Sequence, residues 1–217
     1  MIELLLPIAL AGIILKVRAL DLSGAIGVII LSYLVIVPQN VTWLYPILFS
    51  FLIITIATKI RYRGQERHEV RTIENVLANG GVAVAMAFFG HFYGFLGALS
   101  TATADSISSE VGKLGKEKPR MITDLRKFVQ KGTNGGVTFF GTTVGLIAAG
   151  LIGIMATIIL NEPKTIIIAA LAGTLGNLAD SWFGAVFENK RYLDNAGTNF
   201  LATSAGSLAG IILGSFL

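Results

Sequence analysis

Apolar segments long enough to lie in a lipid bilayer recur from the first residues of this 217-residue chain to the last. A helix that crosses the hydrocarbon core needs about 20 apolar residues, and inside lipid a helix satisfies every backbone hydrogen-bonding group without an open edge. The composition fits this solvent, because 53% of the residues are hydrophobic and only 14% are charged. We therefore expect an all-α fold, a polytopic bundle of transmembrane helices that forms a single integral membrane domain over residues 1–217.

About eight spans are expected, and the first of them is short. The segment 76–112 is too long for one helix and contains the turn-like stretch GHFYG in its middle, so we divide it into two antiparallel helices. The other expected spans are residues 2–15, 20–37, 41–58, 135–160 and 165–187, and a last helix that ends at residue 217. The motifs described below lie within residues 74–204, and residues 1–60 contain none of them.

The basic residues are distributed unevenly between the loops that these spans define. Sixteen of the seventeen Lys and Arg residues fall in loops on one side of the membrane, and only Lys164 falls on the other. Loops rich in Lys and Arg remain on the cytoplasmic side. We therefore expect a multi-pass protein of the cell membrane, with cytoplasmic basic loops and with both termini external.

Two carboxylates lie at membrane depth near the expected cytoplasmic ends of their helices, Asp105 about two helical turns before Lys113 and Asp180 at a similar distance from Lys190. The sequence repeats itself around them. ATADSISSEVGK (102–113) and NLADSWFGAVFENK (177–190) share Ala-Asp-Ser followed by Glu and Lys. After each copy we expect a further helix, which the tripeptide Gly-Thr-Asn opens. Both copies run the same way, which indicates a parallel internal repeat of helix pairs that would bring Asp105 and Asp180 face to face.

An ionised carboxylate inside the membrane is unfavourable unless it is paired, bound to a metal or in contact with water. Two facing carboxylates repel each other and favour a divalent cation, and Mg²⁺ takes one or two carboxylates together with substrate phosphates. We therefore predict Mg²⁺ as the cofactor, with Asp105, Glu110 and Asp180 as its candidate ligands. The structural alternative is that Asp105 and Asp180 cap helix ends or pair with neighbouring Lys.

The stretch KGTNGGV, residues 131–137, is a glycine-rich turn that leads into an expected helix. A helix N-terminus presents N–H groups and the positive end of its dipole, and glycine lets an anion approach the backbone, so this turn is suited to phosphate. A helix start built from small residues for close packing explains the same pattern.

The loop 113–131 before this turn carries seven Lys and Arg residues, among them Lys113, Arg120 and Lys131. These charges can set the topology, contact anionic lipid or neutralise a triphosphate, and Arg120 can make bidentate contacts. Earlier in the chain, Asn75 and Asn79 share one helix face at the cytoplasmic end. Asn79 is a candidate ligand for phosphate, ribose or metal, although membrane Asn residues more often join helices to each other.

Six blocks of the sequence, taken in order, resemble the signature of the membrane family that contains the chloroplast phytyl-phosphate kinase and the transmembrane-protein-19-like proteins. They are ENVLANGGVAVA, ATADSISSEVGK, PRMIT, KGTNGGVTFFGTTVG, AGTLGNLADSWFGA and LDNAGTNFLAT. The resemblance implies phosphoryl transfer from a nucleoside triphosphate, CTP or another, to an isoprenyl monophosphate of phytyl or geranylgeranyl type. It places the following residues on family-motif positions: Asn79, Asp105, Glu110, Arg120, Thr123, Gly132, Thr133, Asn134, Gly135, Gly136, Asp180, Asn195 and Asn199.

The expected function is therefore that of a Mg²⁺-dependent isoprenyl-phosphate kinase, in which Asp105 and Asp180 hold the metal and Arg120 is a cationic clamp. Lys113, Lys131 and the turn 132–136 would bind the nucleotide phosphates. A CTP-dependent lipid cytidylyltransferase or lipid-alcohol kinase would use the same parts, and a transporter or a structural scaffold are alternatives of other classes. We expect no nucleic acid as a partner, and the sequence leaves a homodimer open.

Overall fold

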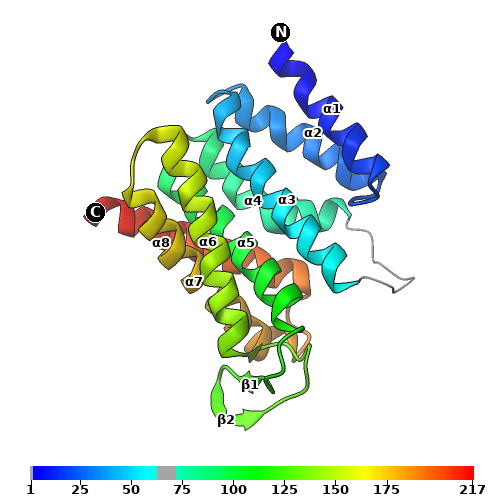
Figure 1. Ribbon diagram of the computed structural model, residues 1–217, viewed down its shortest axis with the longest axis vertical. Helices are drawn as coiled ribbons and strands as arrows, with labels where there is room; N and C mark the ends of the chain where they lie inside the picture. Colours follow the sequence, from blue (N-terminus) through cyan, green and yellow to red (C-terminus); the bar gives the residue numbers. More distant parts are fainter. Residues whose placement is uncertain (1, 63–71) are drawn as a thin grey trace.

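The computed structural model describes residues 2–62 and 72–217 and shows, within them, a bundle of eight α-helices with a small β-sheet at one end (Figure 1). The helices are α1 (Ile2–Lys16), α2 (Leu22–Ile36), α3 (Leu44–Arg61), α4 (Ile73–Phe88), α5 (Phe92–Gly112), α6 (Phe139–Leu160), α7 (Lys164–Phe183) and α8 (Asn195–Phe216). They follow the expected spans, including the break within 76–112. The predicted all-α polytopic membrane bundle is confirmed.

Four segments of the described chain are long and apolar enough to cross a membrane. They are Val41–Arg61, Phe139–Leu160, Lys164–Glu188 and Asn195–Phe216, and shorter apolar helices cover Leu5–Lys16, Leu22–Ile36 and Ile73–Phe88. Large apolar side chains are exposed on the outer faces of these helices, for example Ile158 on α6 and Ile212 on α8. Such exposure is expected where the surrounding solvent is lipid.

Helix α5 packs against α3, α4, α6, α7 and α8, which makes it the centre of the bundle. Glycines allow the backbones to approach closely: a Cβ at Gly97 would lie 2.2 Å from the carbonyl oxygen of Gly206 in α8, and one at Gly176 in α7 would lie 2.1 Å from Thr101 Oγ1. Membrane helices depend on such small residues, because lipid provides no hydrophobic drive for helices to associate. This packing holds α5 and α7, which carry Asp105 and Asp180, side by side.

The basic segment between α5 and α6 folds into a three-stranded antiparallel sheet that was not predicted. Its strands are β1 (Arg120–Met121), β2 (Asp124–Phe128) and β3 (Gly136–Val137), in the order β2-β1-β3. The predicted start of the next helix at about residue 135 is wrong, because residue 135 lies in a turn and β3 follows it. Helix α6 begins at Phe139 instead, after Thr138, whose Oγ1 accepts a hydrogen bond from the backbone N–H of Gly141 at 2.9 Å.

The two Gly-Thr-Asn tripeptides consequently adopt different structures. Residues 132–134 lie in a turn before β3, so the prediction that this copy opens a helix is wrong. Residues 197–199 lie in the first turns of α8, where Asp194 is the N-cap and its Oδ1 accepts from the backbone N–H of Gly197 at 2.7 Å. The repeat is therefore clearest in the two helices that precede these tripeptides.

Candidate active site

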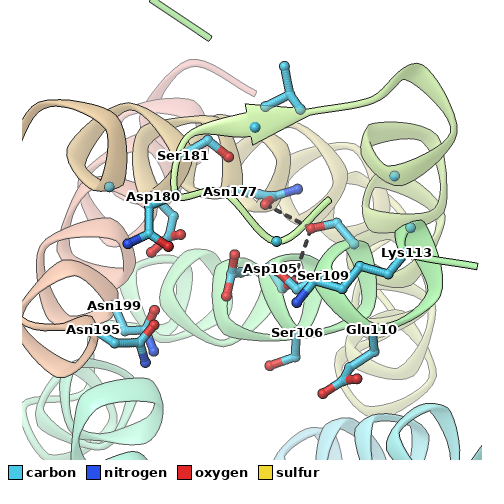
Figure 2. Close-up of a pocket in the computed structure, with 18 of the residues that line it drawn as sticks. Asp105, Ser106, Ser109, Glu110, Lys113, Asn177, Asp180, Ser181, Asn195 and Asn199 are labelled. Atoms are coloured by element: carbon cyan, nitrogen blue, oxygen red, sulfur yellow. Dashed lines mark hydrogen bonds between the residues drawn. The ribbon is translucent and has the colours of Figure 1, made fainter. Parts of the chain in front are cut away.

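A polar cavity of about 590 Å³ lies at the end of the bundle where α5 and α7 end. Figure 2 shows Asp105 from α5 and Asp180 from α7 directed into the same space, with Asn195 and Asn199 of α8 beside it. Most of the predicted site residues line this cavity: Asn79, Asp105, Glu110, Lys113, Lys131, Gly132, Thr133, Asn134, Gly135, Gly136, Asp180, Asn195 and Asn199. Residues more than 100 positions apart in the sequence are thus brought together.

The two aspartates form the acidic centre of the cavity. The side chains of Asp105 and Asp180 are directed into the same space and interact electrostatically, as the repeat predicted. Oδ1 of Asp180 is buried and has no hydrogen-bond partner. Two carboxyl groups this close repel each other when both are ionised, so the site needs a proton or a cation between them.

Glu110, the third predicted metal ligand, has a different partner. Its Oε2 lies 2.6 Å from Nη1 of Arg61, and the side chains of this ion pair are 12% and 22% exposed. No group of three or more Asp, Glu or His side chains that could hold a metal occurs within residues 2–62 and 72–217. The acidic pair alone therefore carries the metal prediction.

The glycine-rich turn forms another part of the cavity wall. Gly132 and Gly135 have positive φ angles of 88° and 82°, a conformation that glycine adopts without strain. A Cβ at Gly135 would lie 2.4 Å from Cβ of Ala185, so the turn is pressed against the end of α7. The carbonyl oxygen of Asn134 accepts a hydrogen bond from Asn189 Nδ2 at 3.1 Å. The glycines thus allow a tight turn over the cavity rather than a helix N-terminus.

Two lysines add positive charge to the same wall. Nζ of Lys131 donates to the carbonyl oxygens of Lys113, at 3.2 Å, and of Gly115, so the turn is also tied to the end of α5. Burial, together with the positive charge of Arg61, lowers the pKa of the Lys113 ammonium, whereas Glu110 and Asp105 act in the opposite direction. Arg61, Lys113 and Lys131 all line the cavity, so its cations face its carboxylates.

The amides predicted to bind ligands are partly engaged with protein. Nδ2 of Asn79 donates to the carbonyl oxygen of Asn75 at 3.0 Å, while Asn75 Oδ1 accepts from the backbone N–H of Thr72 at 2.9 Å and so caps α4. Asn195 and Asn199 reach the cavity from the first two turns of α8. Asn79 also lines the cavity, and it remains a predicted ligand residue.

Arg120 and Thr123 are the predicted residues that the cavity does not include. Arg120 lies on β1, where its Nη1 donates to the carbonyl oxygen of Leu125 at 2.8 Å and its guanidinium lies 4.4 Å from the ring centre of Phe128. It lines a second, neighbouring cavity instead. Thr123 is exposed in the turn between β1 and β2 and lines neither of these two cavities.

Several cavity residues were not predicted. Arg61 ends α3 and is 49 residues from its partner Glu110, so nothing local in the sequence indicated the pair. Asn177 of α7 accepts a hydrogen bond from Ser108 of α5 at 3.1 Å and so joins the two acidic helices. Glu188 lies in a π-helical turn, Gly184–Glu188, and its carboxylate contacts the side chains of Thr198 and Asn134. The signal for Glu188 was present, because each copy of the repeat has a Glu after Ala-Asp-Ser.

Fold and site together define a polytopic membrane protein with a polar, carboxylate-bearing cavity at one end of its helices. The chain belongs to the family described as integral membrane protein DUF92, whose sequence pattern matches residues 5–207. This match confirms the family that the motif blocks indicated.

Relatives of the chain occur in archaea and plants. An uncharacterized membrane protein of Methanocaldococcus jannaschii is 33% identical over 222 residues, which cover 98% of this chain and 93% of that protein. Protein VTE6, chloroplastic, of Arabidopsis thaliana is 26% identical over 190 residues, covering 77% of this chain and 57% of that protein. Protein PGR of the same plant is 35% identical over 107 residues, covering 44% of this chain and 37% of that protein. No solved structure matches the chain.

Proposed function

We propose that the protein is a Mg²⁺-dependent kinase that transfers a phosphoryl group from a nucleoside triphosphate to an isoprenyl monophosphate. The observation that carries this proposal is the Asp105–Asp180 pair in a cavity that also contains the cations Arg61, Lys113 and Lys131. Carboxylates suit a divalent cation, and cations suit phosphates. One cavity at the end of a membrane bundle thus contains both components that phosphoryl transfer requires.

The acidic pair fits Mg²⁺. The buried Oδ1 of Asp180 has no hydrogen-bond partner, and a hard cation with oxygen ligands would satisfy that atom and offset the repulsion between the two carboxylates. Asp105 and Asp180 would hold the ion, whereas Glu110 is bound by Arg61. The chemistry that the ion supplies is neutralisation of charge on the transferring phosphoryl group.

Other residues of the chain would bind and orient the nucleotide. The volume of about 590 Å³ is within the range of about 300–1,000 Å³ that small-molecule and cofactor sites occupy. Lys113 and Lys131 would contact the phosphates, and the turn 132–136 would allow them to approach its backbone closely. Asn79, Asn195 and Asn199 would donate or accept hydrogen bonds from phosphate oxygens or ribose hydroxyls.

The reaction needs little from the protein beyond this positioning. A non-bridging oxygen of the acceptor monophosphate attacks the γ-phosphorus, the bond to the β–γ bridging oxygen breaks, and the nucleoside diphosphate leaves with the electron pair. The acceptor oxygen is already anionic, so no strong base is required. The chain accordingly has no cysteine, and His91 lies at the far end of α5; His68 lies outside the described residues.

The charges around the cavity support a membrane orientation for this site. The basic segment 113–131 borders the cavity, and Lys and Arg residues concentrate in cytoplasmic loops. The cavity would then face the cytoplasm, where nucleotides are dissolved, and both termini would be external. A lipid phosphate whose tail lies in the bilayer would meet the nucleotide at this interface.

A transfer assay tests the proposal directly. Purified protein in nanodiscs would receive Mg²⁺, each of the four nucleoside triphosphates and geranylgeranyl monophosphate, and we expect nucleoside diphosphate and lipid diphosphate as products. Asp105→Asn and Asp180→Asn should each lower kcat by roughly 10²–10³-fold or more, because each removes charge at the transferring group. Glu162→Gln, at the opposite end of the bundle, is the matched control and should retain activity.

The alternatives give different products in the same assay. Full activity of a folded Asp105→Asn protein would contradict the proposal, release of pyrophosphate would identify a cytidylyltransferase, and phosphorylation of the free alcohol would identify a lipid-alcohol kinase. A second readout is independent of turnover: millimolar Mg²⁺ should raise the Tm of the wild type by a few degrees, because a ligand that binds the folded state stabilises it. The Asp105→Asn/Asp180→Asn double variant should show no such rise.

A further inference from the structure

A second cavity, of about 510 Å³, lies between the small sheet and the first turn of α6. Its lining combines two kinds of side chain. Leu125 and Phe128 of β2 and Phe139 of α6 are apolar and exposed, whereas Lys118 and Arg120 are basic. This mixture of apolar surface and positive charge suits a ligand with a hydrocarbon chain and an anionic head group.

The second cavity adjoins the first. Val137, Thr138 and Thr142 line both cavities. The two cavities therefore share a wall that β3 and the start of α6 form. A group bound in the second cavity therefore lies next to the polar cavity that holds the acidic pair. The first cavity contains the carboxylates, and the second contains exposed aromatic side chains.

The charges of the second cavity favour an anion. Arg120 is held at its surface by the hydrogen bond from Nη1 to Leu125 and by the ring of Phe128 beneath the guanidinium. The acidic residue of the lining, Glu117, lies at the first turn of α6, where its Oε2 accepts a hydrogen bond from the backbone N–H of Phe140 at 3.2 Å, so the two basic residues outnumber it. An Arg anchored in this way is suited to a phosphate, to which it can present a planar set of donors.

The apolar side of the cavity continues along the outside of α6. Phe139 is 82% exposed at the start of this helix, and Ile147, Ile154 and Ile158 are exposed further along it. These positions are separated by eight, seven and four residues and so lie on one face of the helix. A hydrocarbon chain that begins at Phe139 would find a continuous apolar face through the membrane.

We infer that the second cavity is the binding site of the lipid monophosphate. Its phosphate lies against Arg120 and Lys118, and its chain follows the outer face of α6. This inference rests on the proposed function, because it names where the acceptor of that reaction binds. Arg120 then acts on the lipid phosphate and not on the nucleotide, in agreement with its position outside the polar cavity.

Binding without turnover tests the inference. Radiolabelled geranylgeranyl monophosphate would be titrated into the protein in phosphatidylcholine nanodiscs, with no nucleotide present. Arg120→Gln should weaken binding about tenfold through loss of a charge-assisted contact. Phe139→Ser should weaken it by about fivefold through loss of apolar contact.

Two matched controls have similar exposure but lie away from the cavity lining. Arg126 is exposed on β2, and Phe216 is 84% exposed at the end of α8. Arg126→Gln and Phe216→Ser should change lipid binding less than twofold, and all four variants should keep the wild-type Tm and the wild-type KM for the nucleotide. A raised KM for the lipid alone would give the same answer in the transfer assay.

The outcomes separate failure of the inference from failure of the proposed function. If Arg120→Gln binds the lipid as tightly as the wild type while transfer proceeds, the inference is wrong and the kinase proposal remains. If phosphatidylglycerol displaces the probe equally well, the cavity is a general anionic-lipid site and the inference is also wrong. If the wild type binds nucleotide but no lipid monophosphate, both the inference and the proposed acceptor are wrong.

Discussion

The acidic side chains at the two ends of the helix bundle are satisfied in different ways. At the end away from the cavity, the hydroxyl of Tyr93 donates to Glu162 at 2.8 Å, and Nζ of Lys164 lies 5.1 Å from the Tyr93 ring centre. The hydroxyls of Thr157 and Thr165 bond to each other at 2.7 Å and to backbone carbonyls. Each polar side chain named here has a partner close by in the chain or on the neighbouring helix.

At the cavity end, by contrast, a buried carboxylate oxygen lacks a hydrogen-bond partner. Asp180 has a buried oxygen without a hydrogen-bond partner and faces Asp105, and two positive-φ glycines hold the neighbouring turn. Buried unpaired groups and close like charges lower stability, and they persist where function requires them. The unsatisfied buried carboxylate oxygen therefore lies at the end of the bundle that contains the proposed binding site.

Among the substitutions that test this difference between the two ends, Gly135→Ala is expected to have the largest effect on stability. Alanine is unfavourable by about 1–2 kcal/mol at positive φ, and its Cβ would also overlap Ala185, so we expect a loss of about 3 kcal/mol in total. Transfer activity should fall at least tenfold, because the turn over the cavity must shift. Thermal unfolding in detergent and the transfer assay would measure both.

Gly150→Ala in α6 is the matched control for Gly135→Ala. A Cβ at Gly150 meets no atom within 4 Å, and the residue is helical, so alanine should leave activity unchanged and slightly raise Tm. If both variants behaved like the wild type, the turn 132–136 would not support the cavity in the way described.

A smaller effect is expected from breaking the Arg61–Glu110 pair. Arg61→Gln removes the guanidinium from the largely buried Glu110 carboxylate and should lower stability by about 2 kcal/mol. The double variant Arg61→Gln/Glu110→Gln should recover much of that loss, since both charges of the ion pair are then absent. Tm values of the two single variants and the double variant form a cycle that measures this coupling.

Activity in the same cycle separates two roles of Arg61. If Arg61 also contacts the nucleotide phosphates, the double variant should regain stability but keep a raised KM for the nucleotide. Recovery of both properties would show that Arg61 only neutralises Glu110, and it would remove this residue from the proposed binding wall.

The sequence was sufficient for the parts of the structure that depend on hydropathy and on local repetition. Each apolar run became a helix because the backbone has no other way to satisfy itself in lipid. The duplicated Ala-Asp-Ser motif predicted that Asp105 and Asp180 would face each other, and they do. These features are encoded within short windows of sequence.

The features that were missed depend on contacts between distant segments. Strands β1 and β3 have two residues each, which is too few for an alternating pattern of apolar and polar residues. The sheet in the basic segment could therefore not be predicted from the sequence. The pairing of Arg61 with Glu110 and the displacement of Arg120 to a second cavity arise from how helices and sheet pack. The basic composition of the loop indicated phosphate binding but could not assign each cation to a cavity.

The smallest effect, and the sharpest test of the comparison, is expected at the opposite end from Tyr93→Phe. This change removes the hydroxyl that Glu162 accepts from, keeps the ring beneath Lys164, and should lower stability by about 1 kcal/mol. Transfer activity should be unchanged, because the end of α5 that carries Tyr93 is separated from Asp105 by three helical turns. Tm and kcat would be measured on the same preparation. A loss of kcat without a loss of Tm would show that the two ends are coupled, and the division between a stabilising end and a functional end would then be wrong.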